Sequence, residues 1–281
     1  MAKQLARELI SAGAHFGHSS NRWNPKMKPF IFAKRGNIHI IDVRKTIKSL
    51  LIAKKLLARI AGSGKDIVFV GTKRQAQDAA KAAAEKCGMH FVNTRWLGGT
   101  LTNFRTIRSR VQRLEELEAM QVEGTLENQS KKQASRLKHE LRKIKNNLDG
   151  IRKMSRLPGA VVAVDGTKEY LALREARKLQ IATIGLLDTN CDPDEVDLAI
   201  PINDDSIRAV QIILNELSDA AAIGKTQHAT REKTQKPRRT RSRTVLARAE
   251  ETRNDSTTVA DDSDQTSKET KGEKEAEAQQ G

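Results

Sequence analysis

Short apolar runs rich in β-branched residues alternate with helical stretches along this chain, and that alternation limits its fold more than any other feature. Runs that are apolar at every position indicate strands buried on both faces, and strands separated by helices form a parallel sheet with both faces covered. The sequence therefore predicts a three-layer α/β domain. The expected strands are residues 66–70, 90–93, 160–165, 181–188 and 198–201, and the expected helices are an Ala-rich segment stopped by Gly88, residues 168–178 and residues 206–217.

The first 60 residues precede this pattern. A helix is expected over residues 3–12, followed by an irregular loop that mixes His, Gly, Asn, Pro and Trp. Two short strands around Lys34-Arg35-Gly36 follow, and Asp42 is placed to cap a helix over residues 43–60.

A different period marks the segment between residues 104 and 155. Apolar residues recur there every three or four positions in two groups, with charged residues between them, and Gly124 lies in the break that separates the groups. This pattern predicts an inserted antiparallel helical hairpin, a two-helix coiled coil whose outer face is free to contact a partner. The predicted domains are residues 1–103 with 156–224, the hairpin 104–155, and a tail 225–281.

The charge of the chain points to a polyanionic partner. Its 281 residues carry a formal net charge of +16. Residues 225–248 hold nine Lys or Arg against one Glu, whereas residues 249–281 hold four against ten acids, so residues 1–224 keep +14. Nucleic acid and an anionic membrane surface are the leading candidates for the partner of a protein this basic. Apolar residues nearly vanish after Gly224, which predicts a disordered tail that is first basic and then acidic.

Composition also excludes several classes. Aromatic residues make up only 3%, too few for rows of stacked bases, whereas recognition of the nucleic-acid backbone and of its shape remains open. Cys87 and Cys191 form no CxxC pair, which argues against a disulfide framework or a cysteine zinc site. We find neither a signal-peptide core nor a membrane-spanning run, and we expect a soluble, cytoplasmic protein.

GTKRQAQ, residues 71–77, is expected where a strand turns into a helix. Backbone N–H groups at a helix start attract anions, and Lys73 and Arg74 add charge. The phosphate-loop pattern GxxxxGK[ST] and the dinucleotide pattern GxGxxG are both absent, so a nucleotide enzyme is disfavoured. An RNA phosphate contact and a plain solvated helix start both remain open.

RWLGGTLTN, residues 95–103, is a second candidate. Gly98 and Gly99 permit close backbone approach, and Arg95, with Arg105 just beyond, is expected to reach phosphate. Trp96 has two interpretations of similar weight: an RNA contact, or a buried anchor for a tight turn.

Carboxylates follow the late strands. The carboxyl ends of parallel strands share one edge of a sheet, so these acids could converge there, and with a histidine of the first loop they could hold a structural divalent cation, Zn²⁺ or Mg²⁺. Helix capping and turn formation explain the same acids without an ion. The candidate ligands are His18, Asp188, Asp204 and Asp205.

Seven blocks of this sequence resemble the bacterial S-two ribosomal protein family in order and spacing over about residues 5–220. They are GAHFGH (13–18), WNPKMKPFIF (23–32), HIIDVRKT (39–46), FVGTKRQA (69–76), RWLGGTLTNF (95–104), LPGAVVAVD (157–165) and DTNCDPDEVDLAIPINDD (188–205).

The resemblance implies a flavodoxin-like domain with a protruding helical hairpin, bound to small-subunit ribosomal RNA and to neighbouring ribosomal proteins. It also implies a role in recruiting the S-one protein, and it implies neither catalysis nor a required cofactor, membrane contact or homo-oligomer. A nucleotide enzyme that uses residues 71–77 and a protein-docking module that uses the hairpin are the competing classes. The expected RNA-binding residues are His15, Trp23, Asn24, Lys26, Lys28, Lys73, Arg74, Arg95, Trp96, Gly98, Gly99, Asn103 and Arg105.

Overall fold

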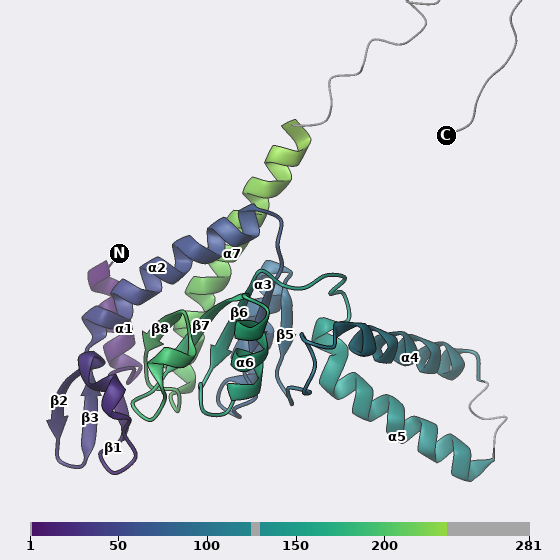
Figure 1. The fold of residues 1–281 in the computed structure, drawn as a ribbon, viewed down its shortest axis with the longest axis horizontal. Helices are drawn as coiled ribbons and strands as arrows, with labels where there is room; N and C mark the ends of the chain where they lie inside the picture. The colour runs from purple at the N-terminus through teal and green to yellow at the C-terminus, as the bar shows by residue number, and fades with distance from the viewer. Residues whose placement is uncertain (1, 125–129, 235–281) are drawn as a thin grey trace, which may run out of the picture. The chain divides into compact units, whose positions relative to one another are not determined.

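A computed structural model describes residues 2–124 and 130–234 of the chain (Figure 1). Residues 1–234 form one compact unit. The predicted disorder of residues 235–281 lies outside the described residues.

The centre of the fold is a five-stranded parallel sheet in the order β5-β4-β6-β7-β8. Each strand coincides with one of the apolar runs, so the predicted parallel sheet is confirmed. The strands are β4 (Ile67–Val70), β5 (His90–Val92), β6 (Ala160–Val164), β7 (Ala182–Leu187) and β8 (Leu198–Pro201).

Helices cover both faces of this sheet. Alternate residues of a strand point to opposite faces, and β4 shows this directly: Ile67 and Phe69 join one hydrophobic core, while Val68 and Val70 join the other. The first core contains residues of α1 (Ala2–Ser11), α2 (Val43–Gly62), α3 (Gln77–Cys87) and α7 (Ile207–Thr234). The second contains residues of α6 (Tyr170–Lys178) and α4 (Phe104–Val122). The fold is therefore a three-layer α/β domain, as predicted.

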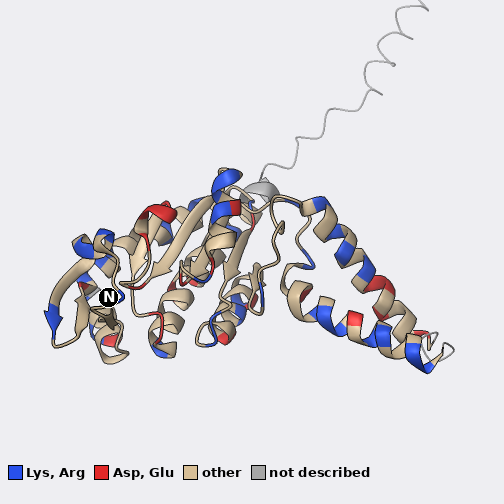
Figure 2. Cartoon of the chain, turned by 60° about the horizontal axis from the view of Figure 1, so that its bottom comes forward, with Lys and Arg blue, Asp and Glu red and all other residues tan. Residues whose placement is uncertain are grey.

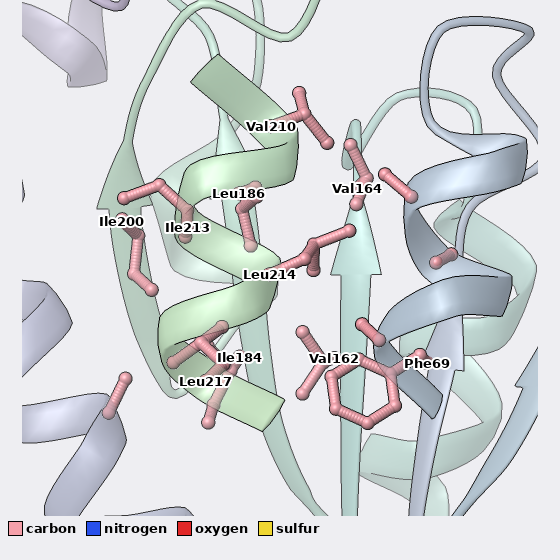
Figure 3. Close-up of a cluster of buried hydrophobic side chains, with 14 of the residues drawn as sticks. Phe69, Val162, Val164, Ile184, Leu186, Ile200, Val210, Ile213, Leu214 and Leu217 are labelled. Atoms are coloured by element: carbon pink, nitrogen blue, oxygen red, sulfur yellow. The ribbon is translucent and has the colours of Figure 1, made fainter. Parts of the chain in front are cut away.

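Figure 3 shows how α7 closes the first core. Val210, Ile213, Leu214 and Leu217 lie on one side of this helix and pack against side chains of β6, β7 and β8. All four are at most 1% exposed, so water is almost completely excluded from the contact between α7 and the sheet. Burial of each such side chain contributes about 1.5–3 kcal/mol.

The helix α7 is longer than the sequence predicted. Expected to end near residue 217, it runs to Thr234, so the predicted start of the tail at residue 225 lies inside a helix. Two contacts explain the extension. A Cβ on Gly224 would lie 2.3 Å from the backbone O of Ala58 in α2, so α2 and α7 approach each other closely there. Lys225 Nζ donates to the backbone O of Gly88 at 2.7 Å, at the end of α3.

A smaller antiparallel sheet in the order β1-β3-β2 precedes α2. The strands β2 (Ile31–Arg35) and β3 (Ile38–Ile41) match the two predicted ones, and Asp42 caps α2 by accepting from the Arg44 N–H. The prediction of an irregular loop after the first helix is wrong in part, because this segment contains β1 (Phe16–Ser19) and a 3-10 helix, η1 (Pro25–Phe30).

The segment 104–155 contains α4, α5 (Lys131–Leu148) and the short 3-10 helix η2 (Asp149–Ile151). Figure 1 shows α4 leading away from β5 and α5 returning. Ion pairs link α4 and α5, with Arg113 Nε 3.6 Å from Glu140 Oε1 and Lys145 Nζ 3.3 Å from Glu118 Oε1. The remaining 3-10 helix is η3 (Pro193–Glu195).

Candidate nucleic-acid interface and acidic cluster

Glu175 on α6 organises the glycine-rich loop that follows β5. Its carboxylate accepts from the backbone N–H groups of Gly99, Leu101 and Thr102 at 2.8, 2.9 and 3.1 Å, and from the indole Nε1 of Trp96 at 3.1 Å. A carboxylate that satisfies four donors holds the loop in a single conformation. The sequence did not reveal this, because an acid on an amphipathic helix is usually solvated.

The pKa of Glu175 reflects the same contacts. Burial alone would raise it, but the backbone N–H groups of Thr102, Leu101 and Gly99 and the Trp96 indole outweigh burial, so the pKa is lowered. The carboxylate is therefore charged when the loop is formed. Trp96 is only 6% exposed, so the structure supports the interpretation of a buried anchor for the turn over an RNA contact.

Arg95, Gly98, Asn103 and Arg105 are exposed around this loop. Arg95 and Arg105 form no salt bridge with any residue that the structure describes, so their charges are available to a ligand. Beside them lies a pocket of about 360 Å³, lined by Leu97, Gly98, Gly99, Asn103, Thr106, Ile107 and Arg110. The rigid loop thus presents exposed cations and a concave polar surface together.

In the first loop, two of the candidate residues, Lys26 and Asn24, are bound to other groups of the protein. Lys26 Nζ lies 2.7 Å from Asp192 Oδ2 and 2.8 Å from Asp194 Oδ2, and these carboxylates raise its pKa. Asn24 caps η1 by accepting from the Lys26 N–H at 3.0 Å. Lys28 is exposed.

The two aromatic candidates of this loop are half-buried. The Trp23 ring centroid is 5.0 Å from that of His39, and the His15 centroid is 4.0 Å from that of Phe16. Of the first-loop candidates, Lys28 is therefore the one best placed to meet phosphate.

Part of the turn 71–77 is engaged within the protein. Thr72 donates its backbone N–H and its hydroxyl to Glu169 Oε1 at 2.8 and 2.5 Å, so the Thr72 amide is not free to bind an anion. Lys73 Nζ binds the carboxylates of Asp204 at 2.8 Å and Asp205 at 2.6 Å. Arg74 remains exposed.

The acids that follow the late strands do converge, at the carboxyl edge of the parallel sheet. Asp188 follows β7 and Asp204 follows β8, while His18 reaches the same point from β1. One ligand atom from each of these three side chains lies within 4.8 Å of the other two. Asp205 lies at the rim, with 55% of its side chain exposed and Oδ2 3.7 Å from His18 Nε2.

Hydrogen bonds and charge shape this acidic cluster, His18, Asp188, Asp204 and Asp205. His18 Nδ1 lies 2.8 Å from Asp188 Oδ2, and this hydrogen bond raises the pKa of His18. Burial, and after it the negative charge of Asp188, raises the pKa of Asp204 to about 7. The turn after β7 also uses this carboxylate, since the Thr189 N–H donates to Asp188 Oδ1 at 2.5 Å.

Lys and Arg residues also recur along α4 and α5 (Figure 2). On α5, Lys131, Lys138, His139 and Arg142 line a shallow depression with Ala134 and Ser135. Arg108 of α4 donates to the backbone O of Met154 at 3.2 Å, which anchors α4 to the domain. Lys138 and Arg142 are exposed.

Neither cysteine is suited to nucleophilic chemistry. Both are buried free thiols. Burial raises the pKa of Cys87, and burial followed by the charge of Asp165 raises that of Cys191 to about 12. Because the thiolate is the reactive form, both are packing residues.

The family model described as "Ribosomal protein S2" matches residues 9–224, well over half of the chain. The chain belongs to the ribosomal protein S2 family. One relative, "Small ribosomal subunit protein uS2" from Rhodopirellula baltica (strain DSM 10527 / NCIMB 13988 / SH1), is 53% identical over 230 residues, which cover 82% of this chain and 88% of the relative. Members of this family are structural proteins and not enzymes, and so is this chain. No helix in the described ranges is long and apolar enough to cross a membrane.

Proposed function

We propose that the protein is a structural constituent of the small ribosomal subunit in the cytoplasm, and that it binds ribosomal RNA and neighbouring ribosomal proteins without turnover. Family membership, the relative's name and the +16 net charge support this proposal. The observation that carries the RNA-binding part is the rigid loop at Glu175, which presents the unpaired cations Arg95 and Arg105 beside a polar pocket.

The binding residues divide into two groups. Exposed cations contact phosphates, which gives affinity with little sequence choice. Lys28, Arg74, Arg95 and Arg105 belong to this group. Gly98, Gly99 and Asn103 present the surface beside them. Of the other expected residues, Lys26, Lys73, Asn24 and Trp96 hold the loops in shape, because their polar groups are engaged inside the protein.

The helices α4 and α5 form the hairpin arm in this proposal, and the basic side chains of α5 extend the contact with RNA or a ribosomal protein. Recruitment of the S-one protein is the further role that we carry over from the family resemblance. Specificity comes from the folded shape of the RNA and from neighbouring proteins, since the exposed aromatic surface for reading bases is small.

The test is incorporation of a tagged chain into small subunits, measured by sedimentation at ribosome-stabilising Mg²⁺. The double variant Arg95→Ala with Arg105→Ala is expected to incorporate less, and its binding to small-subunit RNA to show a log–log salt slope reduced by about 2, one for each lost phosphate contact. Lys55→Ala with Arg59→Ala, which removes two exposed charges from α2, is the matched control.

Two results would count against this assignment. Equal salt slopes for the two double variants would remove Arg95 and Arg105 from the interface. Failure of the unmodified chain to sediment with small subunits would refute the ribosomal role itself. The chain ending at Thr234 should still co-sediment, because the residues up to Thr234 form a compact unit of their own.

A further inference from the structure

The pocket of about 360 Å³ beside the glycine-rich loop lies where α4 begins. A second hollow of about 220 Å³ adjoins it, because Leu97 and Arg110 line both, and Ile144 and Asn147 of α5 continue the second. The two hollows form one groove whose walls come from the loop after β5, from α4 and from α5. The proposed contact of exposed cations with phosphates leaves the interior of this groove unassigned.

The most buried residues that line the first pocket are apolar. Ile107 is only 5% exposed and Leu97 is half-buried, so their side chains offer an apolar surface inside the hollow. Gly98 is exposed, and a Cβ added to it would meet no atom within 4 Å, so the pocket is open on that side. A nucleobase taken out of its stack packs its faces against apolar side chains as well as aromatic ones.

The free polar groups of this pocket are mainly hydrogen-bond donors. Asn103 Oδ1 accepts from the Thr106 hydroxyl at 2.8 Å, and the backbone O atoms of Leu97 and Gly99 already accept inside the loop. The Asn103 amide nitrogen and the Arg110 guanidinium have no partner among the residues that the structure describes. A ligand for the pocket therefore has to supply acceptors. Guanine supplies two on one edge, N7 and O6, and arginine is its most frequent specific partner.

Size and charge favour a nucleotide over a protein segment. Pockets for small ligands begin at about 300 Å³, so the first hollow has room for one nucleobase. A partner helix, about 10–12 Å across, needs a much larger groove. Arg110 and Lys143 line the groove, and Arg95 and Arg105 are exposed near its loop end. Among the described residues of the lining, Glu140 is the single acid, and it already forms an ion pair within the arm.

We propose that this groove holds one unstacked nucleotide of the small-subunit ribosomal RNA, with a guanine base in the pocket at Gly98. This inference rests on the proposed function and adds a sequence preference at one position to binding that otherwise depends on phosphates. The base packs against Leu97 and Ile107, and its N7 and O6 accept from Arg110. Because Glu175 fixes the loop, the pocket exists before RNA binds, which lowers the entropic cost of association.

The test measures methylation of guanine N7 by dimethyl sulfate across the small-subunit RNA. Small subunits depleted of this protein are compared with the same subunits after the full chain has been added at a saturating concentration. One unpaired guanine is expected to be methylated in the depleted subunits and to be protected once the unmodified chain is bound.

Two variants change the pocket without removing charge. Gly98→Leu fills it, and the open space around Gly98 lets the variant fold. Arg110→Lys keeps the charge but loses the planar fork of donors. Both should abolish the guanine protection and weaken binding to depleted subunits by about 10-fold, with an unchanged log–log salt slope because no phosphate contact is lost. Gln112→Leu, which adds the same side chain to an exposed position of α4 outside the groove, is the matched control.

The outcomes separate this inference from the proposed function. The inference alone is overturned if the unmodified chain binds the depleted subunits but protects no guanine N7, or if Gly98→Leu and Arg110→Lys retain the protection. If these variants weaken binding although no guanine is protected, a neighbouring protein fills the groove, and the RNA inference is again overturned. A chain that does not bind the depleted subunits at all overturns the proposed function as well.

Discussion

Replacement of Glu175 by Gln tests whether one carboxylate holds the glycine-rich loop. Gln has almost the same shape, so the change isolates charge and hydrogen bonding. Oε1 accepts from Trp96 Nε1 and Gly99 N, and Oε2 accepts from Leu101 N and from both the N–H and the hydroxyl of Thr102. Because Gln supplies only one carbonyl oxygen, its amide nitrogen must face at least two donors.

The expected loss follows from those two donors. A donor left unpaired inside a protein costs about 1–3 kcal/mol, so two would cost about 2–6 kcal/mol. Glu175 is only half-buried and Thr102 is exposed, so water can replace part of the loss. We therefore expect a decrease of about 2–3 kcal/mol in the free energy of unfolding. For a domain of this size that corresponds to a midpoint about 4 to 12 °C lower.

Thermal unfolding followed by circular dichroism measures this loss, with Glu85→Gln as the control. Glu85 is an exposed glutamate 4.0 Å from Lys81 on α3, and loss of such a pair costs well under about 1 kcal/mol. If Glu175→Gln and Glu85→Gln lowered the midpoint equally, the carboxylate would not be the organiser of the loop.

The same variant has a defined pH dependence. The pKa of Glu175 is lower in the folded chain than its ordinary value of 4.5, so its stabilisation is fully present above that value and is lost as the pH falls through the folded pKa. The difference in midpoint between the unmodified chain and Glu175→Gln should be constant from pH 7 to about pH 5.5 and should shrink at lower pH. A difference that grew on acidification would refute this reasoning.

Other substitutions test other parts of the fold. Gly224→Ala should lower the unfolding free energy by about 1–3 kcal/mol, because its Cβ would meet the α2 backbone, whereas Gly62→Ala, whose Cβ meets nothing closer than 3.7 Å, should be neutral or slightly stabilising in the same denaturant titration. Lys73→Met should lower the unfolding free energy by about 3 kcal/mol in the same titration, since it leaves buried Asp204 unpaired; a loss below about 1 kcal/mol would contradict this reasoning. Phe69→Ala, which empties the centre of the first core, should cost about 3–5 kcal/mol in chemical unfolding.

Local patterns in the sequence were sufficient to predict the parallel sheet. Each of its strands is a short apolar run, and burial on both faces imposes that composition directly. The strand β1 was missed because Phe16 is the single large apolar residue in FGHS; pairing with β3, and not local propensity, makes this segment a strand. The extension of α7 was missed for a related reason, because the contacts that stabilise it come from α2 and from the end of α3.

The sequence predicted where the candidate site lies, but not the role of each of its residues. Lys26 and Lys73 resemble free cations in sequence, but their carboxylate partners lie 166 and 131 residues later in the chain. Glu175 lies 73 to 79 residues from the groups that it binds. Partners this distant leave no signal in the local sequence. The sequence therefore indicated the loops, but only the fold shows which of their side chains remain exposed.

The neighbours β4 and β6 lie at the centre of the sheet, yet the chain between them includes β5 and the whole α4–α5 segment. During synthesis, β4 and β5 emerge well before β6, which begins 68 residues after Val92. At about 5–20 residues per second, the apolar edge of β4 waits roughly 3 to 14 s for its partner. All four residues of β4 are buried in the folded protein. In that interval the nascent chain therefore exposes an apolar strand with unpaired backbone groups, which can pair with another chain. Shortening of the α4–α5 segment should therefore speed folding and reduce aggregation of newly made chains.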